Sequence, residues 1–335
     1  KSFDSEYALN EPFDKVAMTK YLIRRLFSAI PTLFIISFVV FAILALSPGD
    51  PLAEFALNPN VPPEVRDLMR QSLGLDQPWY TRYIKWLGSM LRGDWGYSFA
   101  SRSPVIDLIW QRLPNTLWVV GLAYLFSIAL AIPLGVLSAV KQYSIFDQAV
   151  TTFAFLGYAI PTFFSGLMAI LLFSIKLGWL PFIYDSTIVV KDWPTLWAQI
   201  RQIIMPVAVV GLTEMANLTR FTRSSVLDNL PMDYVRTARA KGLRERTVIL
   251  RHVLRNSLIP VITLLALGVP GIFTGAIITE QIFRVQGIGE LLIRSITSSD
   301  TPVIMAITFV YAALVVLFNL VADILYGFAD PRIRY

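Results

Sequence analysis

Long apolar runs without charge dominate this sequence. A helix of about 20 apolar residues crosses the hydrocarbon core of a bilayer, and five runs of at least this length contain no Asp, Glu, Lys or Arg. These runs are residues 26–49, 113–140, 148–175, 256–279 and 301–322. Charged residues make up 16% of the chain, against about 25% in soluble domains. We therefore predict an all-α polytopic membrane protein.

One acid interrupts a sixth run. Residues 202–219 contain Glu214 among Ile, Val and Leu residues that favour a spanning helix. A charge at the centre of a bilayer costs about 2.5–3.5 kcal/mol on insertion scales, so the Glu214 carboxylate is expected to face protein or water. Prolines within the runs mark candidate bends. They are Pro133, Pro161, Pro206 and Pro270.

Basic residues indicate how the chain is oriented, because Lys and Arg are enriched in cytoplasmic loops. Nine of the 29 Lys and Arg residues lie between the fourth and fifth spans, together with three acids. The nine are Arg220, Arg223, Arg236, Arg239, Lys241, Arg244, Arg246, Arg251 and Arg255. A second basic group, at residues 15–25, precedes the first span. We therefore predict that this loop and both termini are cytoplasmic.

The predicted organisation is one membrane domain. Residues 1–20 are expected to form a cytoplasmic N-terminal extension, and residues 21–335 a single transmembrane domain with six spans. The spans are placed at about 22–47, 114–140, 149–175, 202–220, 257–279 and 302–325. An outer segment, residues 48–113, follows the first span, and a basic cytoplasmic loop, residues 221–256, follows the fourth.

Composition and motifs exclude several chemistries. The chain has no Cys and one His, which excludes disulfides, thiol catalysis and Cys metal sites and leaves little for other metal chemistry. It contains no Gly-x-x-x-x-Gly-Lys-Ser/Thr phosphate loop and no Ser in a nucleophile elbow. The net charge of +6 is not arranged in a nucleic-acid-binding motif. We therefore predict a chain that is not an enzyme and binds no metal, cofactor or nucleic acid.

The basic cytoplasmic loop contains a predicted short helix. Asp233 is suited to cap a helix over residues 234–241, and Gly242 to end it. A second helical pattern begins near Thr247 and continues towards Pro260. A helix that lies across the ends of two spans can transmit a push from a soluble partner. Composition alone also fits an ordinary basic loop of a membrane protein.

The loop carries a specific resemblance. Residues 233–243 and 251–260 resemble the ATPase-coupling loop of the dipeptide, oligopeptide and nickel permease family of ABC importers. Importers in general have Glu-Ala-Ala where this chain has Arg236, Thr237 and Ala238, and the peptide and nickel branch has a loop similar to the present one. Further matches follow in order along the chain. They are residues 21–32, 47–51, 73–78, 82–87, 93–98, 177–181, 280–289 and 319–334.

The resemblance implies a six-helix type I permease architecture in a bacterial inner membrane. It also implies a second homologous permease subunit, two ATP-binding cassette subunits, an extracytoplasmic binding protein and contact with membrane lipid. ATP and Mg²⁺ would bind the partner subunits, and no cofactor would bind this chain. Di- or oligopeptides are the favoured substrates, with nickel or another small solute as the alternative. A secondary transporter or channel, or a structural subunit of an energy-converting complex, is less favoured.

Two sets of site residues follow. The predicted ATPase-coupling helix consists of Asp233, Tyr234, Val235, Arg236, Thr237, Ala238, Arg239, Ala240, Lys241 and Gly242. Tyr234, Val235 and Ala238 are expected to seat in a groove of the ATPase. The translocation-path candidates are Glu214, Asn217, Asn319 and Asp323. For Glu214 the alternative is a structural hydrogen bond to another helix. For Asp323 the alternatives are pairing with Arg332 or Arg334 and a position among the lipid headgroups.

Overall fold

The computed structural model describes residues 15–46, 62–72 and 74–329, and within them every extended regular element is a helix. In chain order these are α1 (Lys15–Leu46), α3 (Pro63–Ser72), α4 (Trp79–Leu91), α5 (Val105–Thr116), η1 (Leu117–Gly121), α6 (Leu122–Val140), α7 (Ile145–Ala159), α8 (Thr162–Ala169), η2 (Ile170–Lys176), α9 (Trp193–Asn229), α10 (Asp233–Ala240), α11 (Glu245–Thr247), η3 (Val248–Val253), α12 (Leu254–Thr274), α13 (Ile277–Ile282), α14 (Ile288–Thr297) and α15 (Thr301–Ala329). The predicted all-α class is confirmed.

Five of the described helical segments are long and apolar enough to cross a membrane. They are Ile23–Leu46, Val105–Val140, Trp193–Asn229, Glu245–Ile282 and Thr301–Leu325. A sixth candidate is the pair Ile145–Ala159 and Thr162–Lys176, which is bent by 99°. The described part of the chain therefore has five such helices, or up to six if the bent pair is one span.

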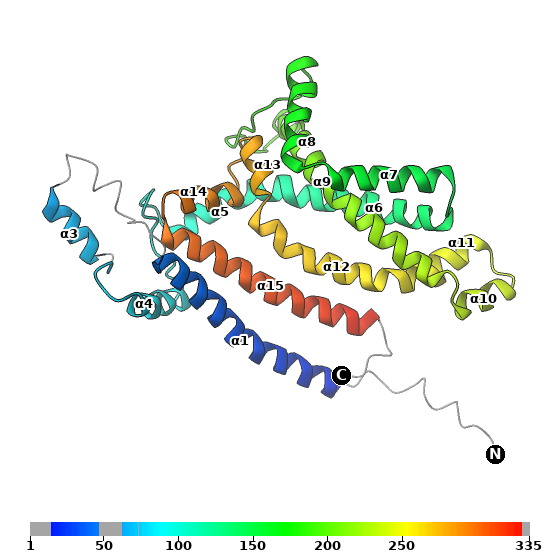
Figure 1. The fold of residues 1–335 in the computed structure, drawn as a ribbon, viewed down its shortest axis with the longest axis horizontal. Coiled ribbons are helices and arrows are strands. Elements are labelled where there is room, and N and C mark those ends of the chain that lie inside the picture. The colour runs from blue at the N-terminus through cyan, green and yellow to red at the C-terminus, as the bar shows by residue number, and fades with distance from the viewer. Residues whose placement is uncertain (1–14, 47–61, 73, 330–335) are drawn as a thin grey trace.

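The long helices lie side by side in a fixed order. Figure 1 shows α7 and α9 at one side of the bundle, then α12, then α15, and finally α1. Helix α6 packs against α9, and α12 contacts both α9 and α15. The short helices α10 and α11 lie at one end of the bundle, while α3, α4 and α14 lie at the other (Figure 1).

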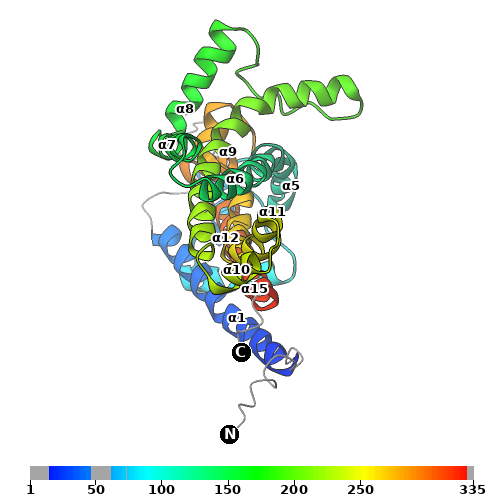
Figure 2. The ribbon, with the colours of Figure 1, turned by 90° about the vertical axis from the view of Figure 1, so that its right-hand side faces the viewer.

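The third predicted span is not one straight helix. Ile160 has extended backbone angles (φ −81°, ψ 122°), and Pro161 follows it as the residue before α8. Proline removes a backbone donor and disfavours helical geometry in the residue before it, so the helix breaks at this dipeptide. Helix α8 consequently points away from the long helices, as both views show (Figures 1 and 2). Pro161 is thus a bend, as its position in the run suggested.

Other helix bounds also differ from the predicted spans. Helix α9 extends the fourth span at both ends, so residues 221–229 are helical and not loop. The fifth span, placed at about 257–279, is interrupted because α12 stops before Gly275, whose φ of +74° does not continue a helix. The predicted extension up to residue 14, residue 47 at the end of the first predicted span, and residues 48–61 of the outer segment lie outside the described residues, as do Arg332 and Arg334.

Small residues let α6 and α9 approach closely. A Cβ atom on Gly135 would lie 2.7 Å from the Thr222 Cβ atom and 2.8 Å from the Thr219 carbonyl oxygen. Glycine at such a crossing is typical of helix pairs in membranes, where close backbone approach supplies packing energy. The interface between these two helices therefore has no room for a side chain at residue 135.

Gly135→Ala is expected to destabilise the protein by about 1–3 kcal/mol, because the added methyl group must push α6 away from α9. The measurement is the melting temperature of the purified, detergent-solubilised protein. Gly88→Ala is the matched control, since no atom lies within 4 Å of a Cβ atom at that helical position. Equal melting temperatures for the two variants would contradict the close crossing.

Candidate functional site

The predicted coupling helix is present as α10, at one end of the bundle (Figure 1). Gly242 has a φ of +76° and lies just beyond its end, which confirms that this glycine terminates the helix. The predicted cap is wrong: Met232 is the N-cap and makes no side-chain cap bond, so Asp233 is the first residue of the helix. The Asp233 carboxylate in the first turn still favours the positive end of the helix dipole.

The apolar face of α10 packs on its own chain. Val235 and Ala238 are 0% and 4% exposed, and they belong to a cluster from α6, α9 and η3. The other members of this cluster are Val136, Ala139, Val226, Val248 and Val253. The Tyr234 hydroxyl donates a hydrogen bond of 2.6 Å to the Asn229 side-chain oxygen. The prediction that Val235 and Ala238 enter a partner groove is therefore wrong, because the bundle itself covers them.

The opposite face of α10 is open and mostly basic. Arg236, Thr237 and Ala240 are exposed, as is Lys241 at the end of the helix. The guanidinium of Arg239 forms an ion pair of 2.7 Å with Glu245, and this carboxylate raises the pKa of Arg239. The pair joins the end of α10 to the start of α11. Arg236 lies 3.6 Å from Asp233, but both side chains are so exposed that this pair contributes little.

Helix α9 carries polar groups that no other described residue satisfies. The Glu214 side chain is exposed in the isolated chain and Asn217 is half-buried. Neither side chain forms a hydrogen bond or an ion pair within the described part of the chain. Because α9 is a candidate membrane span, such groups are expected to meet water, substrate or another protein chain and not lipid.

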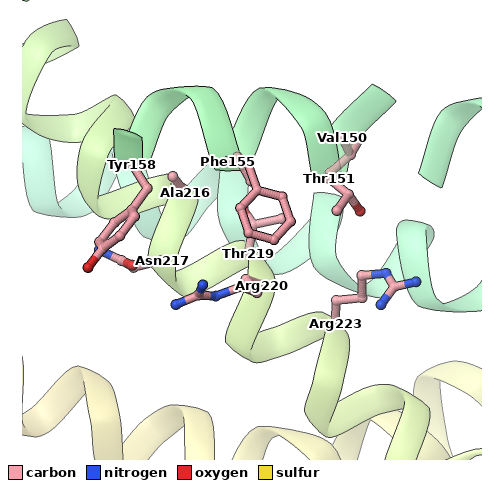
Figure 3. A pocket seen from close by; sticks show the side chains of 10 residues that line it. Val150, Thr151, Phe155, Tyr158, Ala216, Asn217, Thr219, Arg220 and Arg223 are labelled. Carbon is pink, nitrogen blue, oxygen red and sulfur yellow. The ribbon is translucent and has the colours of Figure 1, made fainter. Parts of the chain in front are cut away.

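A cavity of about 160 Å³ lies between α7 and α9, next to these polar groups. Asn217 and Arg220 of α9 and Tyr158 of α7 line it, and the three side chains lie near one another in Figure 3. The guanidinium carbon of Arg220 is 5.6 Å from the centre of the Tyr158 ring, a cation–π distance. The remaining lining is largely apolar.

Asn319 and Asp323 lie elsewhere. They line a groove of about 530 Å³ between α1 and α15, where the Asp323 carboxylate is 3.2 Å from Arg25. The predicted partners of Asp323, Arg332 and Arg334, fall outside the described residues, so that pairing stays a prediction. Helix α12 lies between α9 and α15, so the fold does not bring these two residues together with Glu214 and Asn217.

A fully buried acid, Glu280, was not among the predicted site residues. Its carboxyl group accepts hydrogen bonds from the Thr116 hydroxyl (3.1 Å) and the Glu290 backbone N–H (2.9 Å). The Thr116 hydroxyl in turn accepts one from the Ile288 N–H at 2.8 Å. This acid therefore holds the start of α14 against α5. The glycines near Glu280 in the sequence could have indicated this close packing. A Cβ atom on Gly287, for example, would lie 2.4 Å from a Glu280 oxygen.

A second buried acid fastens α7 to α9. The Asp147 carboxylate accepts two hydrogen bonds from Arg223, of 2.7 Å and 2.8 Å. It also accepts one from the Tyr143 N–H at 2.9 Å, and the Ser138 hydroxyl donates to it. Arg223 was predicted only as part of a basic loop. The described residues contain no group of three or more His, Asp or Glu side chains that could hold a metal ion.

Comparison with known proteins identifies the family. Residues 131–335 match the model of the "binding-protein-dependent transport system inner membrane component", and residues 18–120 match its N-terminal companion model. The chain is 43% identical over 319 residues to the oligopeptide transport system permease protein AppB of Bacillus subtilis, covering 95% of this chain and 100% of that protein. It is 38% identical over 318 residues to the glutathione transport system permease protein GsiC of Escherichia coli K12, again covering 95% of this chain and 100% of that protein.

These matches confirm the resemblance in the coupling loop and extend it to nearly the whole chain. They also account for the apolar helices, because a permease of such a system is a multi-pass protein of the bacterial inner membrane. The chain belongs to the family of inner membrane components of binding-protein-dependent transport systems, and as such it is a transport subunit, not an enzyme, that works with an ATPase and a binding protein.

Proposed function

We propose that this chain is one of two homologous permease subunits of an ATP-driven importer for di- or oligopeptides. Two ATP-binding cassette subunits dock at the end of the bundle that carries α10, and they bind the ATP and Mg²⁺. An extracytoplasmic binding protein delivers the peptide at the opposite end. Both termini and α10 lie in the cytoplasm, and this chain binds no cofactor itself.

The observation that carries the proposal is the two-sided character of α10. One face is buried against α6, α9 and η3, while the other exposes Arg236, Thr237 and Ala240. A helix held in this way moves together with the helices beneath it. The two relatives, whose names refer to oligopeptide and to glutathione, itself a tripeptide, support peptides as the substrate class.

A transport cycle follows from these contacts. Closure of the ATPase pair moves α10, and because Val235 and Ala238 pack on α6 and α9, the movement passes to those helices. Helix α9 carries Glu214 and Asn217, the polar groups proposed to line the path. Asp147 and Arg223 make α7 follow α9. The peptide is thus exposed to one side of the membrane and then to the other, without a chemical step on this chain.

The proposal is tested with the complete complex in proteoliposomes. A peptide-loaded binding protein is expected to stimulate ATP hydrolysis and ATP-dependent uptake of labelled peptide. The same preparation is assayed with Ni²⁺ in place of the peptide. Uptake of Ni²⁺ without uptake of any di- to hexapeptide would overturn the peptide assignment, and transport without the ATPase subunits would overturn the importer assignment.

Arg236→Glu is expected to uncouple transport from ATP hydrolysis without lowering stability, because this side chain is 73% exposed and makes only a weak contact with Asp233. Peptide-stimulated ATPase activity of the assembled complex should fall by about 10-fold, the scale of one charge-assisted contact. Arg236→Lys should retain most of it.

Ala238→Asp distinguishes the two faces of α10. It places a carboxylate without a partner in the cluster that Val235 and Val248 share, so it should lower the melting temperature of the isolated subunit. If Arg236→Glu lowers the melting temperature as much as Ala238→Asp does, the assignment of the exposed face is wrong.

A further inference from the structure

The cavity between α7 and α9 contains an arginine without an acidic partner. Arg220 forms no ion pair within the described residues, and its guanidinium lies over the Tyr158 ring. Arg223, one turn further along the same helix, is bound by both oxygens of Asp147. Asp147, the acidic residue of α7, is therefore already bound to Arg223. The positive charge of Arg220 remains available at the cavity.

Two further hydrogen-bonding groups at this cavity are unsatisfied. The Thr219 hydroxyl is buried, and it has no hydrogen-bond partner in the described structure. The Thr219 side chain lines the cavity, as does Asn217, whose amide forms no hydrogen bond with any described residue either. A buried hydroxyl without a partner costs about 1–3 kcal/mol, so such a group indicates a ligand or water that satisfies it.

The lining selects an anion of small size. A guanidinium, an amide and a hydroxyl all donate hydrogen bonds, and no Asp or Glu is among the residues that line the cavity. A guanidinium matches the two oxygens of a carboxylate particularly well. Val150, Ala154 and Phe155 form an apolar wall beside these donors, and apolar surroundings strengthen such a bond. The cavity has a volume of about 160 Å³.

We propose that Arg220, Asn217 and Thr219 form a binding site for the C-terminal carboxylate of the transported peptide. The proposal rests on the peptide-importer function proposed above. It adds a selection step within the membrane domain, after the binding protein has released its cargo. Tyr158 orients Arg220 for this contact through its ring face.

The test compares trialanine with trialanine amide in proteoliposomes that contain the complete importer. The measured quantity is the ratio of the two uptake rates, in the original protein and in Arg220→Gln. Because the same binding protein delivers both peptides, its own preference cancels when the ratios are compared. We expect the trialanine preference to fall about 10-fold in Arg220→Gln, the scale of a lost charge-assisted hydrogen bond, and to persist in Arg220→Lys.

Two further variants separate binding from structure. Thr219→Val removes only the hydroxyl at nearly constant volume and should also lower the preference for trialanine. A purely structural threonine would instead give a more stable protein with unchanged preference. Arg24→Gln is the matched control. Arg24 is an exposed arginine of α1 at the same end of the bundle, and it neither lines the cavity nor belongs to α10. It should leave the ratio unchanged.

The contrary outcomes are distinct. If Arg220→Gln slows the uptake of both peptides equally, and the loss depends on adding phosphatidylglycerol to phosphatidylcholine vesicles, Arg220 binds lipid phosphate and the carboxylate site is excluded. An unchanged ratio in both Arg220→Gln and Thr219→Val also overturns the site. Failure of the original importer to take up trialanine, or any other peptide, would instead overturn the proposed function.

Discussion

Glu280→Ala is expected to lower the free energy of unfolding by about 3 kcal/mol or more, because it strands several buried donors at once. The side chain is 0% exposed, and its oxygens accept from the Thr116 hydroxyl and the Glu290 N–H. Removing it leaves the Glu290 N–H, in the first turn of α14, without this acceptor. The measurement is the unfolding of the purified, detergent-solubilised subunit, followed by its melting temperature and by denaturant titration.

Two variants control this experiment. Gln281→Ala alters the next residue, which is exposed and forms no side-chain hydrogen bond in the described structure, so it should change stability by less than about 0.5 kcal/mol. Glu280→Gln keeps the shape of the side chain but replaces one accepting oxygen with an NH₂ group, which would face donors. This variant should therefore also be less stable than the original protein. If Glu280→Ala unfolds like Gln281→Ala, this acid does not hold the outer end of the bundle together.

The same substitution has a predicted structural consequence. Helix α14 packs on α15 and α5, and Ile288 and Leu291 are buried in the cluster that joins them. Once the start of α14 is released, this cluster loosens at the end of the bundle opposite to α10. Under the proposed function, that end receives cargo from the binding protein. Peptide uptake should therefore fall even at temperatures where the variant remains folded.

Asp147→Ala is the second substitution with a large expected effect. It removes the acceptor for both Arg223 hydrogen bonds and leaves a guanidinium three-quarters buried between α7 and α9. Breaking a buried pair from one side costs about 3–5 kcal/mol, and the partial exposure of Arg223 places the expected loss near the lower end. The measurement is again the unfolding of the purified subunit.

A double-mutant cycle identifies the cause. The double variant Asp147→Ala and Arg223→Met contains no stranded charge, so it should recover much of the loss seen in Asp147→Ala. If the stability loss of the double variant equals the sum of the losses of the two single variants, the two residues do not act as a pair. Arg24→Met serves as the matched control, since this exposed arginine has no comparable acid beside it in the described structure and its loss should have little effect.

Local sequence patterns predicted a good part of this molecule. The long apolar runs correspond to the candidate spans because span length depends only on the thickness of the bilayer. Pro161 marked the bend between α7 and α8, and Gly242 marked the end of α10, since each restricts or frees its own backbone. These features depend on a residue and its chain neighbours.

Other features were misjudged because they depend on distant segments. Val235 and Ala238 form the apolar side of an amphipathic helix, but the sequence does not say which surface covers that side. The fold brings Val136 and Val253 to it, so the face that is free for a partner is the polar one. For the same reason no local pattern indicated that Asp323 forms an ion pair with Arg25, which lies near the other end of the chain.

By itself the sequence determined the membrane class, the long apolar helices and the place of the short helix α10, because each depends on a continuous stretch of residues. Only the tertiary structure decided which polar groups are satisfied. Asp147 pairs with Arg223, which is 76 residues away in the sequence, and Glu280 accepts a hydrogen bond from Thr116, which is 164 residues away. Arg220 and Glu214, by contrast, form no ion pair within the described chain. Burial and pairing are properties of the packed helices, so they appear only once the helices are placed against one another.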